Sequence, residues 1–210
     1  MKRNEIYQIL YEIMKSPLVQ RFMAFDPELA DVTIKRCLEE KGLQYLGSGM
    51  YAAVAKHPAH PGKAFKISVS RFDGYREYAK FCLARQGDKH IPEIYHSYVA
   101  GDYSFYEMKE YRSIPEREDR IEEDLIEPRM RVITWGANGY LGCDDEDFEK
   151  YKSLLRVVKN IRVMYKGRFS IDVHYGNVML DENNEMIITD PIAGDIRREI
   201  EAEDSVPVFE

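Results

Sequence analysis

The stretch that most constrains this chain is residues 169–191, which read FSIDVHYGNVMLDENNEMIITDP. It places Asp172, Asn177 and Asp190 at successive offsets of five and thirteen residues. Between the last two lie two short apolar runs, joined by the polar turn 181–184. The pattern predicts a loop that carries an acid and an amide, then a tight hairpin, then a second acid just past its end. Carboxylate and amide oxygens are ligands that Mg²⁺ prefers.

Composition limits the class of protein. In a chain of 210 residues, 44% hydrophobic and 12% aromatic residues indicate a packed globule. The formal charge is −7 and the basic residues are scattered, so we expect no nucleic-acid partner. The three cysteines (37, 82 and 143) are far apart, which favours a reduced cytosolic setting over disulfides or zinc. The N-terminus does not read as a signal peptide and no apolar run reaches membrane-spanning length, so we expect a cytoplasmic protein without a membrane partner. The oligomeric state stays open.

The first 42 residues read as helical. Apolar residues recur at helical spacing over 4–15, and a second short helix is expected to end at Phe25. Asp26 then provides an N-cap, Pro27 fits the first helical position, and Gly42 fits the C-terminal cap. We interpret residues 1–42 as an N-terminal helical extension packed on the following domain.

From residue 43 to residue 111 the pattern is mainly that of strands. Residues 44–46, the turn Gly47-Ser48-Gly49 and residues 51–56 predict a glycine-containing hairpin of the form GxGxxAxV. Glycines in such a turn let backbone N–H groups approach phosphates, although a plain β-turn is the alternative. The next strand, 64–69, carries Lys66, which either faces inward beneath the turn or is an ordinary solvated lysine.

Residues 73–86 predict a helix, followed by strands at 94–99 and 103–111. Glu77 is the candidate to pair with Lys66, with Asp73 as an alternative partner, and a surface salt bridge would explain Glu77 equally well. Residues 112–143 carry mixed charges and are interpreted as a linker with a variable lid.

The second lobe is expected to comprise residues 144–210. It opens with the strongest amphipathic pattern in the chain, which starts after Asp144-Asp145, runs to Tyr165 and is capped by Gly167. A short acidic tail follows Ile192.

Taken together, these motifs resemble those of protein kinases, and within them the small early-gene serine/threonine kinases of tailed bacteriophages of enteric bacteria. The likeness covers roughly residues 46–192 and rests on LGSGMYAAVAKHP, AFKIS, EYAKFCLARQG followed by IPEIY, FSIDVHYGNVM and IITDP. It implies an α+β, two-lobed kinase-like fold with an antiparallel sheet in the N-lobe, a reduced helical C-lobe and the N-terminal helical extension. It also implies ATP- and magnesium-dependent phosphorylation of host-cell proteins in the bacterial cytoplasm, and of the kinase itself.

The resemblance assigns a role to each matching residue. Asp172 is expected to accept the proton of the attacking hydroxyl, and Lys66 to neutralise phosphate charge. Asn177 and Asp190 are the expected magnesium ligands, and the backbone at 108–110 is expected to contact an adenine ring. The full nucleotide-binding set comprises Gly47, Ser48, Gly49, Val54, Lys66, Glu77 and Met108.

The sequence departs from the kinase pattern at two points. Ser170-Ile171-Asp172 stands where His-Arg-Asp is usual, and Asp190-Pro191-Ile192 stands where Asp-Phe-Gly is usual. No Ala-Pro-Glu element follows Asp190 in residues 191–210, and the resemblance is to the kinase part of larger family members, without their further C-terminal domain. Two alternatives therefore stay open: a small-molecule phosphotransferase of the kinase fold, and a nucleotide-binding pseudokinase that acts by contacting a host protein.

Overall fold

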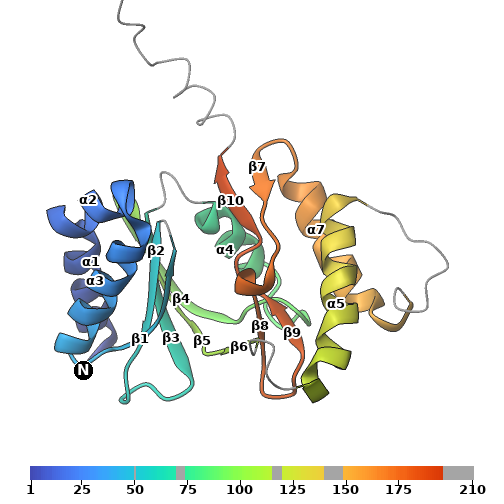
Figure 1. Ribbon diagram of the computed structural model, residues 1–210, viewed down its shortest axis with the longest axis horizontal. Helices are drawn as coiled ribbons and strands as arrows, with labels where there is room; N and C mark the ends of the chain where they lie inside the picture. Colours follow the sequence, from blue (N-terminus) through green and yellow to red (C-terminus); the bar gives the residue numbers. More distant parts are fainter. Residues whose placement is uncertain (50, 70–73, 115–119, 140–148, 196–210) are drawn as a thin grey trace, which may run out of the picture. The chain divides into compact units, whose positions relative to one another are not determined.

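The structure is a computed structural model, and it describes residues 1–49, 51–69, 74–114, 120–139 and 149–195 (Figure 1). The chain forms two compact units. Unit 1 comprises Met1–Arg76 and Glu93–Glu110, and unit 2 comprises Glu77–Pro92 and Tyr111–Glu210.

Unit 1 contains a five-stranded sheet in the order β1-β2-β3-β5-β4, with antiparallel pairing throughout. Aromatic and β-branched residues favour the strands 63–69, 94–100 and 103–109, and the burial of β3 and β5 identifies them as central. All five strands were predicted within a few residues of their ends. Their bounds are β1 Gln44–Gly49, β2 Ala52–Lys56, β3 Lys63–Val69, β4 Ile94–Ala100 and β5 Tyr103–Lys109.

Three helices precede the sheet, namely α1 (Arg3–Lys15), α2 (Pro17–Phe25) and α3 (Pro27–Glu40). The predicted cap is confirmed, because Asp26 Oδ1 accepts a hydrogen bond from the Leu29 N–H at 3.1 Å. Gly42 has a φ of +77°, the left-handed conformation that favours glycine after a helix.

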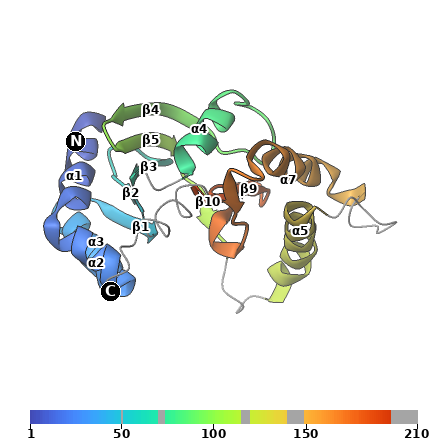
Figure 2. The ribbon, with the colours of Figure 1, turned by 90° about the horizontal axis from the view of Figure 1, so that it is seen from above.

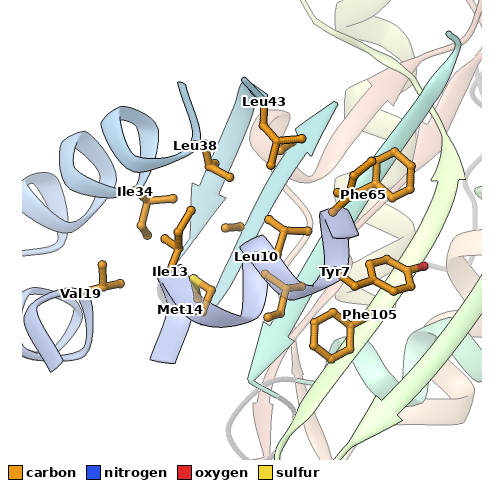
Figure 3. Close-up of a cluster of buried hydrophobic side chains, with 14 of the residues drawn as sticks. Tyr7, Leu10, Ile13, Met14, Val19, Ile34, Leu38, Leu43, Phe65 and Phe105 are labelled. Atoms are coloured by element: carbon orange, nitrogen blue, oxygen red, sulfur yellow. The ribbon is translucent and has the colours of Figure 1, made fainter. Parts of the chain in front are cut away.

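The core of unit 1 lies between these helices and the sheet. Figure 3 shows Leu10 and Met14 of α1, Ile34 and Leu38 of α3, and Phe65 of β3 among its side chains. All five are nearly inaccessible to solvent. Burial of side chains of this size stabilises the fold by about 1.5–3 kcal/mol each. The N-terminal helices are therefore part of the hydrophobic core of unit 1.

Unit 2 combines helices with two small sheets. The strand order is β6-β8-β9 in one sheet, and β10 pairs with β7 in the other. Helix α4 begins in unit 1 and continues into unit 2. The bounds are α4 Tyr75–Leu83, β6 Arg112–Ser113, α5 Arg120–Asn138, α7 Lys152–Tyr165, β7 Phe169–Ile171, the 3₁₀ turn η1 Tyr175–Asn177, β8 Val178–Leu180, β9 Met186–Ile188 and β10 Ile192–Asp195.

The segment 112–143 differs from the predicted linker, because most of its described residues form helix α5. Its mixed charges and the internal Pro128 obscured the helical pattern, since proline removes a helix hydrogen bond. Packing compensates for that loss: α5 and α7 lie side by side, as Figure 2 shows. At Gly136 an added Cβ would lie 2.9 Å from Leu155 Cδ1 and 3.2 Å from Val158 Cγ1, so glycine permits the close approach.

The helical pattern predicted from residue 144 appears in the structure as α7, and Asp144-Asp145 lie outside the described residues. In the described part of the chain, no helix combines the length and apolar character needed to cross a bilayer.

A buried histidine links α7 to the β6-β8-β9 sheet of unit 2. His90 is only 4% exposed, and its Nδ1 lies 2.7 Å from the Met186 carbonyl oxygen, to which the Nδ1–H donates. The hydroxyl of Ser153 on α7 lies 2.9 Å from the other ring nitrogen, Nε2. Burial lowers the pKa of His90 below its ordinary value, so the folded protein favours the neutral ring.

We therefore predict that His90→Asn reduces the pH dependence of stability. Asn accepts the positive φ of position 90 and retains one donor, so the expected loss near neutral pH is about 1–3 kcal/mol. Because the folded pKa lies below the unfolded one, wild-type stability is fully present above the unfolded pKa and is lost as pH falls through the folded pKa. Urea unfolding from about pH 7.5 to about pH 5 should show the wild-type advantage shrinking on acidification. Parallel curves for the two proteins would contradict this role of His90.

Candidate active site

The residues predicted for the site divide between the two units. Gly47, Ser48, Gly49, Val54, Lys66 and Met108 belong to unit 1. Glu77, Asp172, Asn177 and Asp190 belong to unit 2. Each group is described within its own unit.

In unit 2 the loop acid and the loop amide contact each other directly. Asn177 Nδ2 donates to the Asp172 carbonyl oxygen at 2.8 Å and to Asp172 Oδ2 at 3.2 Å. These bonds fix the turn from β7 through η1 and orient the Asp172 carboxylate. They use the amide nitrogen of Asn177, so the amide oxygen is the atom of this side chain that suits a cation.

Backbone hydrogen bonds bring the second acid to the same place. The carbonyl oxygen of Asn177 accepts from the Thr189 N–H at 2.9 Å and from the Asp190 N–H at 3.2 Å. The Asp172 N–H donates to the Pro191 carbonyl oxygen at 2.8 Å. Asp172, Asn177 and Asp190, which follow one another at offsets of five and thirteen residues, are thus gathered at one point of unit 2.

Two strand pairings hold this point from either side. The predicted hairpin is confirmed as β8 and β9, with Val178 opposite Ile188 and Leu180 opposite Met186. After Asp190 the chain pairs back as β10 against β7, with Ile192 opposite Ile171. Asp172 follows β7 directly, and Asp190 lies between β9 and β10.

The loop acid is accessible to a reactant. The Asp172 side chain is 49% exposed. His174 Nε2 lies 3.7 Å from Asp172 Oδ1, while its Nδ1 accepts from the Gly176 N–H at 3.1 Å. In the neutral ring the proton is therefore on Nε2, on the side of the carboxylate. The position of His174 two residues after the acid was the only sequence signal for this contact.

Glu77 is fixed within unit 2. The Tyr165 hydroxyl donates to the Glu77 carbonyl oxygen at 2.8 Å. The Glu77 carboxylate pairs with Lys80 at 2.5 Å, and Arg168 lies at 3.9 Å. The predicted pairing of Glu77 with Lys66 stays a prediction, and the alternative partner Asp73 lies outside the described residues.

In unit 1, Lys66 lies on central strand β3 and is only 5% exposed. Its Nζ lies 3.3 Å from the centroid of the Tyr75 ring, and Tyr75 also packs edge-on against Tyr106. Burial of an ammonium group is costly without a partner, and the aromatic face supplies a favourable one. The lysine therefore faces inward, and the interpretation of Lys66 as an ordinary solvated strand lysine does not apply.

Val54 and Met108 lie on strands beside Lys66. Val54 of β2 is the register partner of Lys66. Met108 of β5 is buried, and its Sδ lies 3.6 Å from the Tyr75 hydroxyl. The N–H groups of the next two residues, Lys109 and Glu110, donate to the carbonyls of Glu93 and Gly62. These two N–H groups are therefore already bonded within unit 1, and the predicted adenine contact at 108–110 stays a prediction.

The glycine-containing hairpin forms as predicted, although its glycines are strand residues. Gly47 pairs with Val54 and Gly49 with Ala52 across β1 and β2. A Cβ added at either glycine would meet no atom within 4 Å. Contacts with the described residues therefore do not require glycine at these two positions.

The side-chain oxygens predicted as metal ligands are of the type that magnesium prefers. Among the described residues no group of three or more His, Cys, Asp or Glu side chains could hold a metal by itself. Asp190 and Asn177 would supply one carboxylate and one amide oxygen. Magnesium at nucleotide sites commonly takes one or two protein carboxylates, and phosphate and water oxygens complete its shell. The predicted pair matches that type of site and does not match a closed protein cage.

We predict that Asn177→Ala destabilises unit 2 even without a ligand. The substitution removes both side-chain bonds to Asp172, so the free energy of unfolding should fall by about 1–2 kcal/mol. Asn183→Ala, in the exposed turn between β8 and β9, is the matched control and should change stability by less than about 0.5 kcal/mol. Chemical denaturation of the three proteins gives the comparison. Equal losses in both variants would contradict a specific role of Asn177 in holding the loop.

Comparison with known proteins shows the family to which this chain belongs. The model of the family described as "Bacteriophage T7 protein kinase 0.7" matches residues 20–207. Among solved structures, the chain is similar to the kinase PK-1 of Cydia pomonella granulovirus, with 14% sequence identity and a TM-score of 0.39. That likeness covers 76% of this chain and 57% of the viral kinase. No curated protein sequence matches. Since the family match extends over most of the chain, the predicted kinase-like fold is confirmed, and the chain belongs to the bacteriophage T7 protein kinase family.

Proposed function

We propose that this chain is an ATP- and magnesium-dependent protein serine/threonine kinase that phosphorylates host-cell proteins, and itself, in the bacterial cytoplasm. The observation that carries the proposal is the gathering of Asp172, Asn177 and Asp190 by hydrogen bonds in unit 2. Family membership supports a protein kinase, and the sequence resemblance supports serine and threonine as the acceptors.

Each residue of unit 2 has a role that its environment supports. Asp172 aligns an incoming hydroxyl and accepts its proton, which requires the exposure that its carboxylate has. Asn177 holds Asp172 through its amide nitrogen and offers its amide oxygen to magnesium. Asp190 supplies the carboxylate of the metal site. Bound magnesium neutralises charge on the phosphate oxygens.

The residues of unit 1 bind the nucleotide in this proposal. Phosphoryl transfer depends on positioning and charge neutralisation more than on covalent chemistry. Lys66 supplies a fixed positive charge because its strand is central and its ammonium group is buried against Tyr75. Gly47 and Gly49 supply backbone N–H groups that phosphate oxygens can approach without a Cβ in the way.

A small-molecule phosphotransferase is the second candidate, and the two departures from the kinase pattern favour it. Ile171 stands where an arginine is usual, and Pro191 begins the return of the chain to β7. The nucleotide and metal roles of the residues are the same in both candidates, so only the acceptor distinguishes them. A pseudokinase is the third candidate, and the presence of Lys66, Asp172 and Asp190 weighs against it.

We predict that phosphorylation by the purified protein depends on both acids. Incubation with γ-labelled ATP and magnesium, alone and with bacterial lysate, should label the protein and lysate proteins. Asp172→Ala should reduce the rate about 10²–10⁴-fold, since a positioned general base contributes that much. Asp190→Ala should abolish labelling, and Asp88→Ala, which removes an exposed carboxylate of unit 2, should leave it unchanged.

The pattern of label separates the candidates. Label on small metabolites and none on protein would establish the small-molecule enzyme. ATP binding without labelled products would establish the pseudokinase. Labelling that persists in both acid variants would contradict the assigned roles and indicate a contaminating kinase.

We further predict that Lys66→Met lowers kcat/KM for ATP. Methionine fills the buried volume over Tyr75 and removes the charge, so the fold should persist. The expected loss is about 10²–10³-fold, the range for removing one preorganised electrostatic group. Lys35→Met changes an exposed lysine of α3 and should behave as wild type. Steady-state kinetics with varied ATP gives the ratio, and an unchanged kcat/KM in Lys66→Met would exclude a phosphate-binding role.

A further inference from the structure

Helix α3 is hydrogen-bonded to the glycine-containing hairpin. Asp31, in the second turn of α3, accepts hydrogen bonds at Oδ1 from the hydroxyls of Tyr45 and Ser48 on β1. The two hydroxyl oxygens lie 3.2 Å apart, so the three side chains form one compact polar cluster. Tyr45 and Ser48 lie on either side of Gly47 along β1.

The cluster is attached to a rigid support. Asp31 lies on a helix whose Ile34 and Leu38 are buried in the core of unit 1 (Figure 3). The N-terminus of the same helix is capped by Asp26. The Tyr45 ring packs against that core, and burial, reinforced by the bond to Asp31, raises its pKa to about 12. Tyr45 therefore keeps its hydroxyl proton and stays a donor across the working pH range.

The strand at this point has little other side-chain support. The β1–β2 register shifts between Tyr45 and Gly47, which marks a bulge in the ladder. Gly47 and Gly49 have no side chains, and glycine loses more conformational freedom on folding than any other residue. The bonds from Tyr45 and Ser48 to Asp31 of α3 hold this segment in addition to its pairing with β2. They also direct the Ser48 hydroxyl toward the helix, so the predicted contribution of Ser48 to nucleotide binding falls to its backbone.

We propose that Asp31 is a positioning residue for the nucleotide: by holding Tyr45 and Ser48 it fixes the backbone of Gly47–Gly49 in the conformation that binds phosphate. This inference rests on the proposed ATP-dependent function and adds a role for the N-terminal helices in it. Asp31 acts through the hairpin and touches no reacting atom. Its loss should therefore weaken nucleotide binding and leave the turnover of bound nucleotide nearly unchanged.

The test compares Asp31→Ala, Asp31→Asn, Tyr45→Phe and the matched control Glu40→Gln. Glu40 is an exposed carboxylate on the same helix whose described partner is Arg36, one turn away. Calorimetry with Mg-ATP should show binding weakened about 5- to 30-fold in Asp31→Ala, the equivalent of one or two lost hydrogen bonds. Asp31→Asn keeps one acceptor oxygen and should recover part of the affinity, and Glu40→Gln should bind as wild type.

Two further readouts distinguish positioning from general destabilisation. Hydrogen exchange of residues 44–56 should speed up in Asp31→Ala, while exchange in unit 2 stays the same. In steady-state kinetics the KM for ATP should rise with kcat within about twofold of wild type. If Asp31→Ala fails to fold, Tyr45→Phe decides, because it removes one donor and keeps the packed ring.

The outcomes separate this inference from the proposed function. Wild-type affinity in both Asp31→Ala and Tyr45→Phe would overturn the positioning role and leave the kinase proposal standing. Faster exchange at the hairpin with unchanged affinity would also overturn it, because the cluster would then be structural only. Failure of the wild-type protein itself to bind Mg-ATP would overturn the proposed function and the inference together.

Discussion

The arrangement of the candidate site depends on the hydrogen bonds that the carbonyl oxygen of Asn177 accepts. This oxygen accepts hydrogen bonds from the N–H groups of Thr189 and Asp190, and the Thr189 hydroxyl donates to it at 3.0 Å. The same residue holds Asp172 through its side chain. Asn177 is therefore hydrogen-bonded both to the loop acid, through its side chain, and to the second acid, through its carbonyl oxygen. Hydrogen bonds of this kind hold the backbone of the candidate site in one arrangement before any ligand binds.

The core of unit 2 holds the segment that donates these hydrogen bonds. The Tyr78 hydroxyl of α4 donates to the Ile188 carbonyl oxygen at 2.5 Å, one residue before Thr189. The backbone of Ile188 also donates to the His90 carbonyl oxygen, so β9 is held by two elements that are distant in sequence. All three residues of β9 are apolar and buried, and the polar residues Thr189 and Asp190 follow directly after the strand. The candidate site residue Asp190 therefore lies just after the end of the buried strand β9.

The sequence predicted most of these elements because their signals are local. The Asp26 cap, the hairpin of β8 and β9 and the strand carrying Lys66 each depend on residues within a few positions of one another. Asp172, Asn177 and Asp190 could be named for the same reason, since a short motif contains all three. Helix α5 was missed because Pro128 and its charges resemble a linker, and only its packing on α7 explains it. Asp31 was missed because it lies 14 residues from Tyr45 and 17 from Ser48, and no short-range pattern marks such a contact.

The two residues that depart from the kinase pattern, Ile171 and Pro191, both take part in backbone pairing. Ile171 pairs with Ile192, so the position that usually holds an arginine belongs to the β7–β10 ladder. Pro191 lacks an N–H but its carbonyl accepts from the Asp172 N–H, which uses the one backbone polar group that proline has. The loop acid is thus oriented by backbone pairing with the segment after Asp190. In a kinase that orients its base through an arginine and a phosphorylated loop, that orientation can be switched by a charge. Backbone pairing carries no such charge dependence, so the proposed base of this chain is positioned by the fold itself.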